Sequence, residues 1–253
     1  MIPMVGRVER YLLEKIGSEG AVHMTLIDPE KVTSSQASRI ANKAKLSGTS
    51  AIMVGGSTFV STTHLDSVVK AVKRAAGLPV ILFPNNVTGI SRYADAIWFM
   101  SLLNSADPYF LVGAQVLGAP IVKKYRLEPL PMGYIIVGDG GTAGVVGKAV
   151  PVPYNKPELA AAHALAAQYL GMRFIYLEAG SGAKKPVPPE MIRAVKSYVD
   201  VPIIVGGGIR SGEQALAAAS AGASIIVTGN IVENAEVKQK VSEIIKGIRS
   251  CRE

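Results

Sequence analysis

Eight short apolar runs, most of them rich in β-branched residues, recur along the 253-residue chain, and longer amphipathic stretches separate most of them. Continuous apolar strands of this kind are typical of a parallel sheet that helices cover on both faces and that right-handed crossovers connect. The predicted strands are residues 21–28, 50–56, 79–83, 95–100, 133–140, 172–180, 201–208 and 223–230. Eight such units in a chain of about this length are typical of a (β/α)₈ TIM barrel.

A doubly wound dinucleotide-binding sheet is the main alternative, but its glycine fingerprint belongs in the first strand–helix unit. The first predicted strand here runs into "LIDPEK", which contains no glycine. The later "GGGIRS" (206–211) does not complete the G-x-G-x-x-G spacing either. We therefore predict one TIM-barrel domain over residues 1–253.

One strand–helix unit is incomplete. Residues 84–94, "PNNVTGISRYA", are too short and too poor in apolar periodicity for a normal crossover helix. We predict a modified barrel in which the helix after the third strand is reduced or missing. The resulting gap is either a plain deletion or a slot for a long ligand or another subunit. Residues 101–132 are more apolar than one surface helix requires, which core packing, an apolar-ligand wall or a partner interface would explain.

Composition narrows the class of protein. Hydrophobic residues make up 49% and charged residues 18% of the chain, as in a compact globular protein, and the net charge is +8. An excess of basic residues favours anionic partners such as phosphorylated small molecules. Nucleic acid is not expected, because long runs of Lys and Arg are absent and only five Phe and one Trp are available for stacking.

The cellular location is predicted from cysteine usage and from the first residues. The one cysteine, Cys251, cannot form a disulfide within the chain, which favours a reducing compartment. The first 17 residues carry charges where a signal peptide would need its apolar core. Residues 215–232 contain no charge, but Gly222 divides them into a helical half and a β-branched half rather than a membrane span. We predict a cytoplasmic protein.

The ends of the first two strands offer oxygen ligands. In TIM-barrel enzymes the reactive residues lie at the carboxyl ends of the strands. Asp28 ends the first strand, and Gly55, Gly56 and Ser57 end the second. A carboxylate and a hydroxyl on neighbouring strands suit Mg²⁺, which often completes its shell with substrate phosphates. An Asp before a Pro is also a common helix cap or turn residue.

The ends of the last three strands are rich in glycine. Glu178 is followed by Gly180–Gly182, the seventh strand ends in Gly206–Gly208, and the eighth ends in Gly229 and Asn230. Glycines after strands seven and eight match the phosphate site of TIM barrels, where backbone amides hold the anion. Tight turns alone would be the plainer explanation. The three histidines show no metal-ligand spacing and are interpreted as structural, and covalent catalysis is not expected.

The motifs "LIDPEK", "IMVGGS", "FPNN", "YLEAGSG", "VGGGIRSG" and "VTGN" together resemble the geranylgeranylglyceryl phosphate synthases of archaea, a family that includes bacterial heptaprenylglyceryl phosphate synthases. The likeness covers residues 20 to 235. It implies a prenyltransferase that joins geranylgeranyl diphosphate to sn-glycerol 1-phosphate and releases diphosphate, at the first step of archaeal ether-lipid synthesis.

The resemblance also implies roles for individual residues. Asp28 and Ser57 would hold Mg²⁺ on the prenyl diphosphate, and Glu178 would contact the glycerol hydroxyl and take its proton. The residues that would bind glycerol 1-phosphate are Tyr176, Leu177, Glu178, Ala179, Gly180, Ser181, Gly182, Gly207, Gly208, Gly229 and Asn230.

Three alternatives stay open at this point. The first is a heptaprenylglyceryl phosphate synthase with a longer donor. The second is another phosphate-binding barrel enzyme, such as an FMN-dependent oxidoreductase. The third is a non-catalytic protein that binds anionic lipid or nucleic acid.

The apolar region 101–132, with Trp98 before it, also predicts a homo-oligomer, either a dimer or a hexamer. Peripheral membrane contact is a further expectation.

Overall fold

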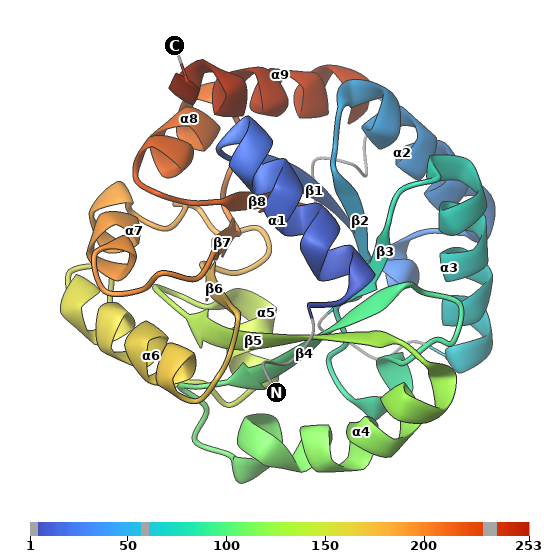
Figure 1. Cartoon of the computed structure of the whole chain (residues 1–253), viewed down its shortest axis with the longest axis horizontal. Helices are drawn as coiled ribbons and strands as arrows, with labels where there is room; N and C mark the ends of the chain where they lie inside the picture. Colours follow the sequence, from blue (N-terminus) through green and yellow to red (C-terminus); the bar gives the residue numbers. More distant parts are fainter. Residues whose placement is uncertain (1–4, 57–60, 230–236, 253) are drawn as a thin grey trace.

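The computed structural model describes residues 5–56, 61–229 and 237–252. Eight parallel strands close into a barrel in which each strand pairs with its neighbours in sequence order, and β8 pairs with β1 (Figure 1). The strands are β1 Val22–Ile27, β2 Ala51–Val54, β3 Val80–Leu82, β4 Ala96–Leu102, β5 Glu128–Ile136, β6 Phe174–Glu178, β7 Ile203–Gly206 and β8 Ile225–Thr228. The predicted TIM barrel is confirmed.

Helices form a ring around the barrel (Figure 1). The helices of the ring are α2 Ser34–Ser47, α3 Thr62–Ala76, α4 Ala114–Tyr125, α6 Pro157–Tyr169, α7 Pro189–Lys196, α8 Gly212–Ser220 and α9 Val237–Arg249. Two more helices, α1 Arg7–Glu19 and the short α5 Gly141–Val146, lie inside this ring in Figure 1. Short helical turns are η1 Pro29–Lys31, η2 Val87–Gly89, η3 Tyr109–Gly113 and η5 Ser250–Arg252. Within the described ranges, no helix combines the length and the apolar character that crossing a membrane would require.

The core has two parts because side chains of a strand alternate between the two faces of the sheet. Inside the barrel, Met24, Met53, Trp98 and Phe174 are almost completely buried. The residues that alternate with them pack against the helices. In α3, for example, Ser61 caps the first turn and Gly77 ends the helix in a left-handed conformation, which aligns a buried apolar stripe with the sheet. On each strand, the residues of one face therefore fill the barrel below the site, and the residues of the other face hold the helices in place.

The strand β5 begins five residues earlier than the sequence predicts, and it includes Pro129 and Pro131. A proline lacks the N–H that a sheet ladder uses. The carbonyl of Pro131 accepts a hydrogen bond from the backbone N–H of Arg173. The backbone nitrogens of both prolines therefore point toward β6 and not toward β4. On that side, strand pairing starts only at Met132, opposite Phe174. The prolines therefore remove no ladder bond, and the extension of β5 toward its amino end is tolerated.

The connection between β3 and β4 contains only the three-residue turn η2, in place of a crossover helix. In Figure 1, α3 and α4 are successive members of the outer ring, with only connecting chain between them. The predicted loss of the helix after the third strand is thus confirmed. In place of that helix, α4 packs against β4 and η2.

The helix α1 closes the amino end of the barrel, where it crosses the centre of the ring in Figure 1. The carboxylate of Glu128, at the start of β5, accepts hydrogen bonds of 2.8 Å from the backbone N–H groups of Val8 and Glu9 in the first turn of α1. Buried Glu9 in turn accepts two bonds from the guanidinium of Arg173, at 2.6 and 2.7 Å. With this end closed, a ligand has access to the carboxyl ends of the strands.

Candidate active site

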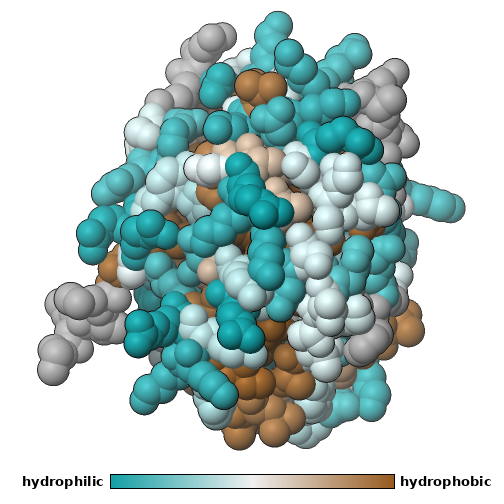
Figure 2. Space-filling view, turned by 90° about the vertical axis from the view of Figure 1, so that its right-hand side faces the viewer, coloured by the Kyte–Doolittle hydropathy of each residue, from teal (hydrophilic) through white to brown (hydrophobic). Residues whose placement is uncertain are grey.

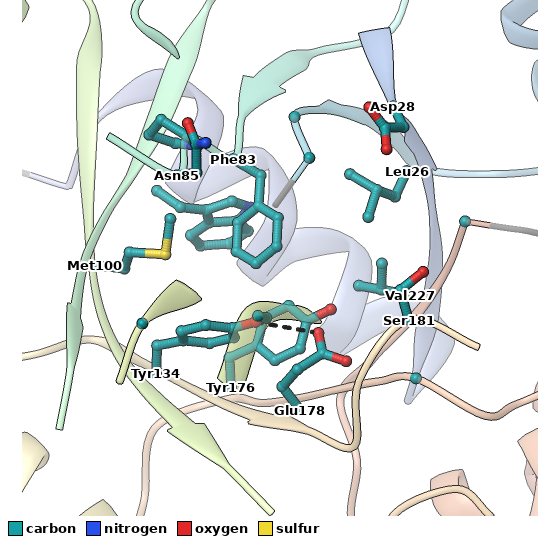
Figure 3. Close-up of a pocket in the computed structure, with 18 of the residues that line it drawn as sticks. Leu26, Asp28, Phe83, Asn85, Met100, Tyr134, Tyr176, Glu178, Ser181 and Val227 are labelled. Atoms are coloured by element: carbon teal, nitrogen blue, oxygen red, sulfur yellow. Dashed lines mark hydrogen bonds between the residues drawn. The ribbon is translucent and has the colours of Figure 1, made fainter. Parts of the chain in front are cut away.

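A cavity of about 510 Å³ opens at the carboxyl ends of the strands. It is large enough for a small-molecule substrate. Its lining includes Asp28 after β1, Phe83 after β3, Tyr134 on β5 and Glu178 at the end of β6, all of which surround the same opening in Figure 3. Residues from opposite sides of the barrel therefore share one site.

Glu178 is the buried acidic group of this cavity, with only 7% of its surface exposed. Its Oε1 accepts a 2.7 Å hydrogen bond from the backbone N–H of Gly180, and its Oε2 accepts a 3.4 Å bond from the hydroxyl of Tyr134 (Figure 3). Burial raises the pKa of the Glu178 carboxyl, and the hydrogen bonds from Gly180, Tyr176 and Tyr134 oppose that rise in part. A carboxylate with a raised pKa and a fixed orientation is suited to accept a proton.

Three aromatic rings lie beside Glu178. The ring of Phe83 stacks on that of Tyr176 at 5.4 Å between centroids, and it meets the ring of Tyr134 edge to face at 5.5 Å. Burial, reinforced by the charge of Glu178, raises the pKa of both tyrosines well above the usual range. Both hydroxyls are therefore protonated at neutral pH and can donate to the carboxylate.

The loops after β5, β6 and β7 pack backbone against backbone. Gly180 has a φ of +104°, and a Cβ there would lie 2.7 Å from the backbone of Gly140 and Gly141. Gly207 has a φ of +83°, and its Cβ would lie 2.6 Å from the carbonyl oxygen of Gly180 and 2.7 Å from Oε1 of Glu178. Only glycine fits this approach, which brings several backbone amides to one edge of the cavity.

Basic side chains border the same cavity. Lys31, Arg210 and Lys240 contribute to its lining. The guanidinium of Arg210 donates a 3.1 Å hydrogen bond to the carbonyl of Gly182, so it also links the loops after β7 and β6. A positively charged rim at a partly enclosed site favours anionic substrates.

Asp28 lies across the cavity from Glu178. Its Oδ1 accepts a 3.1 Å bond from the N–H of Glu30, and its carboxylate lies 3.9 Å from the ammonium of Lys31. The same Asp28 therefore caps η1, as the plainer sequence interpretation predicts, and also faces the cavity. Across residues 5–56, 61–229 and 237–252, three or more His, Cys, Asp or Glu side chains nowhere converge as metal ligands would.

The cavity continues into an apolar slot between β4 and α4, on the side that lacks a crossover helix. Figure 2 shows apolar residues gathered at the height at which α4 lies in Figure 1. The slot is lined by Val87, Ile90, Phe99, Met100, Phe110, Ala114, Gln115, Gly118 and Val122. Some of the apolar residues of segment 101–132 therefore line the slot. Others, namely Val112, Val116 and Leu117, face outward and are 57–65% exposed.

Comparison with known proteins matches residues 14–248 to the PcrB family. The chain belongs to the PcrB family. Among curated relatives, the geranylgeranylglyceryl phosphate synthase of Thermofilum pendens is 56% identical over 247 residues, which cover 97% of this chain and 96% of the relative. The enzyme of the same name from Pyrococcus abyssi is 56% identical over 249 residues, which cover 97% of this chain and 99% of the relative.

Solved structures agree with this membership of the PcrB family. The (S)-3-O-geranylgeranylglyceryl phosphate synthase of Thermoplasma acidophilum, solved in complex with sn-glycerol-1-phosphate, superposes with a TM-score of 0.93. It is 43% identical, and the match covers 98% of this chain and all of that one. A thiamine phosphate pyrophosphorylase from Pyrococcus furiosus, with 13% identity and a TM-score of 0.60, shares the fold alone.

The structure brings most of the predicted site residues of this PcrB-family chain to one cavity. Those that line it are Asp28, Tyr176, Glu178, Ser181, Gly182, Gly207, Gly208 and Gly229. Leu177 and Ala179 do not line it, because their side chains alternate outward into the core beneath the helices. Gly180 contributes through its backbone N–H to Glu178. Ser57 and Asn230 lie outside the described residues.

The sequence interpretation missed several residues of the cavity wall, among them Phe83, Trp98, Met100 and Tyr134. Tyr134 pairs in register with Tyr176 across β5 and β6, so both rings point into the barrel at the same height. The period-two alternation of "GYIIVG" contains this signal, but it becomes readable only when the inward face of each strand is known.

The histidines take structural positions, as the sequence predicts. His23 lies on the outward face of β1, where its ring forms hydrogen bonds with the hydroxyls of Thr49 and Thr228 at 3.0 and 2.8 Å. Burial lowers its pKa to about 3, so the ring is neutral. His64 contacts the backbone carbonyls of Pro29 and Val32, and His163 that of Leu159.

Proposed function

We propose that this protein transfers a prenyl group from an allylic prenyl diphosphate, geranylgeranyl diphosphate, to the hydroxyl of sn-glycerol 1-phosphate. The products are geranylgeranylglyceryl phosphate and diphosphate. The proposal follows the names of the curated relatives, which are about 55% identical over nearly the full chain. It also follows the ligand named for the Thermoplasma acidophilum structure, sn-glycerol-1-phosphate.

The observation that carries this proposal is the division of one cavity into two chemical environments. On the side of β6 to β8 lie Glu178 and the glycine loops, which suit a small phosphorylated alcohol. On the side of β3, β4 and α4 lies an apolar slot, which suits a hydrocarbon chain. A transferase that joins these two kinds of molecule requires both environments at one site.

Glu178 is the general base in this proposal. The hydroxyl oxygen of the glycerol moiety attacks C1 of the prenyl group, the C1–O bond to diphosphate breaks, and the proton of the hydroxyl passes to Glu178. The N–H of Gly180 and the hydroxyl of Tyr134 fix the direction of the carboxylate. Backbone amides of Gly207 and Gly208, with Arg210 and Lys240 nearby, are suited to hold phosphate.

Mg²⁺ is proposed as the cofactor, with Asp28 as the described ligand and Ser57 outside the described residues. The carboxylate of Asp28, which borders the cavity, fits Mg²⁺, because this ion usually takes one or two carboxylates and completes its shell with water and substrate phosphate. When bound, the ion supplies positive charge that stabilises the departing diphosphate. The flanking Lys31 adds to that charge.

Incubation of the purified protein with sn-glycerol 1-phosphate, Mg²⁺ and a series of prenyl diphosphates tests the proposal, with mass spectrometry of the products. We expect geranylgeranylglyceryl phosphate, and we expect Glu178→Gln and Asp28→Asn to lower the rate of its formation by orders of magnitude. The absence of product from every donor would contradict the proposal. A preference for a C35 donor would instead favour heptaprenylglyceryl phosphate synthase, and a yellow preparation with bound flavin would favour an FMN enzyme.

We also propose that the protein is a homo-oligomer, a dimer or a hexamer. The exposed apolar side chains of Val112, Val116 and Leu117 on η3 and α4 support it, because such clusters usually mark an interface. Light scattering of the wild type and of Val116→Glu tests it, with dissociation expected in the variant.

Peripheral membrane contact is a separate proposal, and sedimentation of the protein with anionic vesicles tests it. The cytoplasmic location stays a prediction that rests on the cysteine usage.

A further inference from the structure

We infer that Phe83 is a catalytic residue whose ring, supported by Tyr176 and Tyr134, stabilises the positive charge that develops on the allylic carbon during transfer. This inference rests on the proposed function. The charge arises because the C1–O bond of the donor breaks and diphosphate takes the electron pair. It disappears when the oxygen of the glycerol hydroxyl bonds to C1 and its proton passes to Glu178.

The position of Phe83 supports this role. It follows the last residue of β3 directly, and the hydrogen bond from its N–H to the carbonyl of Val54, at 2.9 Å, fixes its backbone. Its side chain is half-buried and borders the cavity together with Asp28 and Glu178 (Figure 3). Because Asp28 belongs to the proposed diphosphate side and Glu178 to the hydroxyl side, the reacting carbon must pass between them, next to this ring.

The local surroundings make the ring electrostatically important. Leu26, Trp98, Met100 and Val227 contribute apolar surface to the same cavity, and such surroundings strengthen the attraction between a cation and the ring. The face of an aromatic ring carries partial negative charge, which attracts a cation within about 6 Å of the centroid. An aromatic face thus stabilises a transient carbocation without offering an atom that would trap it.

The stack with Tyr176 holds the ring in a fixed orientation. The two ring planes differ by only 12°, and the perpendicular contact with Tyr134 supports the pair from the side. Both tyrosines are also linked to Glu178, so the aromatic cluster and the general base are positioned by the same residues. Preorganised electrostatic groups of this kind lower a barrier because they need no rearrangement during the reaction.

The decisive experiment replaces Phe83 by phenylalanine analogues with one, two and three ring fluorines, which weaken the negative face stepwise and barely change the size of the side chain. The measured quantity is the single-turnover rate of product formation with geranylgeranyl diphosphate and glycerol 1-phosphate. We expect the rate to fall with each fluorine, to roughly 30-fold below wild type, which corresponds to about 2 kcal/mol. The KM values of both substrates should change less than twofold.

The matched control is the same fluorine series at Phe174, which is buried inside the barrel against Trp98 and does not line the cavity. Its single-turnover rates should stay within twofold of wild type. Phe83→Leu, which keeps apolar bulk but removes the ring, should lose about as much rate as the trifluoro variant, whereas Phe83→Tyr should retain most of it.

Three outcomes would overturn the inference, and they are distinguishable from one another. If wild-type protein forms the product and the Phe83 series stays flat, the ring has no electrostatic role although the proposed function holds. If wild-type protein forms no product from any prenyl diphosphate, the proposed function fails and the inference fails with it. A rate that falls at Phe83 but equally at Phe174 also counts against it.

Discussion

The two sides of the cavity reach their chemistry by different means. On the side of β6, β7 and β8, the backbone forms the site, because loops rich in glycine bring N–H groups close to one another and to Glu178. On the side of β3, β4 and α4, side chains form the site, and an absent crossover helix leaves the space. A phosphate therefore meets a rigid surface, whereas a hydrocarbon chain meets one that substitution can reshape.

This contrast predicts that substitutions on the phosphate side impair catalysis or binding where they disturb Glu178 or the closely packed backbone. Those on the slot side should change specificity and preserve the chemistry. The comparison can be tested at each side with single residues.

The largest effect is expected for Glu178→Gln on the phosphate side. The amide keeps the shape of the side chain and one acceptor for the Gly180 N–H, but it cannot take a proton. Loss of a general base typically costs 10²- to 10⁴-fold in rate, and we expect a fall in kcat of about 10³-fold. Steady-state kinetics with both substrates measure it.

The control for this variant is Glu213→Gln, on the exposed surface of α8, which should retain full activity. Binding of glycerol 1-phosphate to the Glu178→Gln protein, measured by calorimetry, should change far less than kcat. A kcat within tenfold of wild type would show that Glu178 only positions the hydroxyl, and the distinction between the two sides of the cavity would weaken.

The second prediction compares two glycines of the phosphate side. Gly207→Ala combines a positive φ with a Cβ that clashes with Gly180 and Glu178, so the amide edge must shift. We expect the KM for glycerol 1-phosphate to rise by roughly 10- to 100-fold, since a misplaced donor loses a charge-assisted hydrogen bond. Initial-rate kinetics at varied glycerol phosphate concentration test this.

Gly229→Ala is the matched control on the same side. Among the described residues, the atoms nearest to a Cβ there belong to the side chain of Leu26, at 3.5 Å, which is an ordinary contact, and no positive φ constrains the residue. The KM should therefore change by less than about threefold. Equal effects of the two substitutions would argue against a backbone cradle that depends on close approach at Gly207.

The third prediction concerns the slot. Gly118 is buried on α4, and a Cβ there would already contact Ile90 at 3.4 Å. Gly118→Leu should fill part of the slot and shift the preferred donor toward shorter prenyl diphosphates. We expect about a tenfold change in the ratio of kcat/KM values, because each methylene that no longer fits is worth roughly 1–3 kcal/mol.

A competition assay with a mixture of C10 to C20 donors measures this shift through the masses of the products. Val116→Leu, on the exposed side of the same helix, is the control and should leave the product distribution unchanged. An unchanged distribution in Gly118→Leu would mean that the prenyl chain does not occupy the slot.

The sequence predicts these two sides unequally, for a physical reason. The glycine-rich loops and the acidic residues at the strand ends are local signals, because each stands directly after a strand that the sequence itself marks. The missing helix after β3 is local as well, and its loss is confirmed. The aromatic cluster is not local, since Phe83, Tyr134 and Tyr176 meet only when strand register brings three strands to the same height. The assignment of Leu177 and Ala179 to substrate binding meets the same difficulty, because strand alternation turns their side chains away from the cavity.

The smallest expected effect is on stability. It measures how far the buried carboxylate of Glu178, on the phosphate side, destabilises the folded protein. Burial raises the pKa of Glu178 above its unfolded value, so the folded state binds this proton more tightly. The contribution of Glu178 to the free energy of unfolding is therefore fully present below the pKa of the unfolded state. It is lost as the pH rises through the pKa of the folded state.

At neutral pH Glu178→Gln should melt a few degrees above wild type, since each 1 kcal/mol shifts Tm by about 2–4 °C in a domain of this size. Thermal unfolding from pH 4 to pH 8 should show the difference growing with pH, whereas Glu213→Gln should show none. A Tm difference that is constant across this range would mean that the variant acts through packing and not through the buried charge.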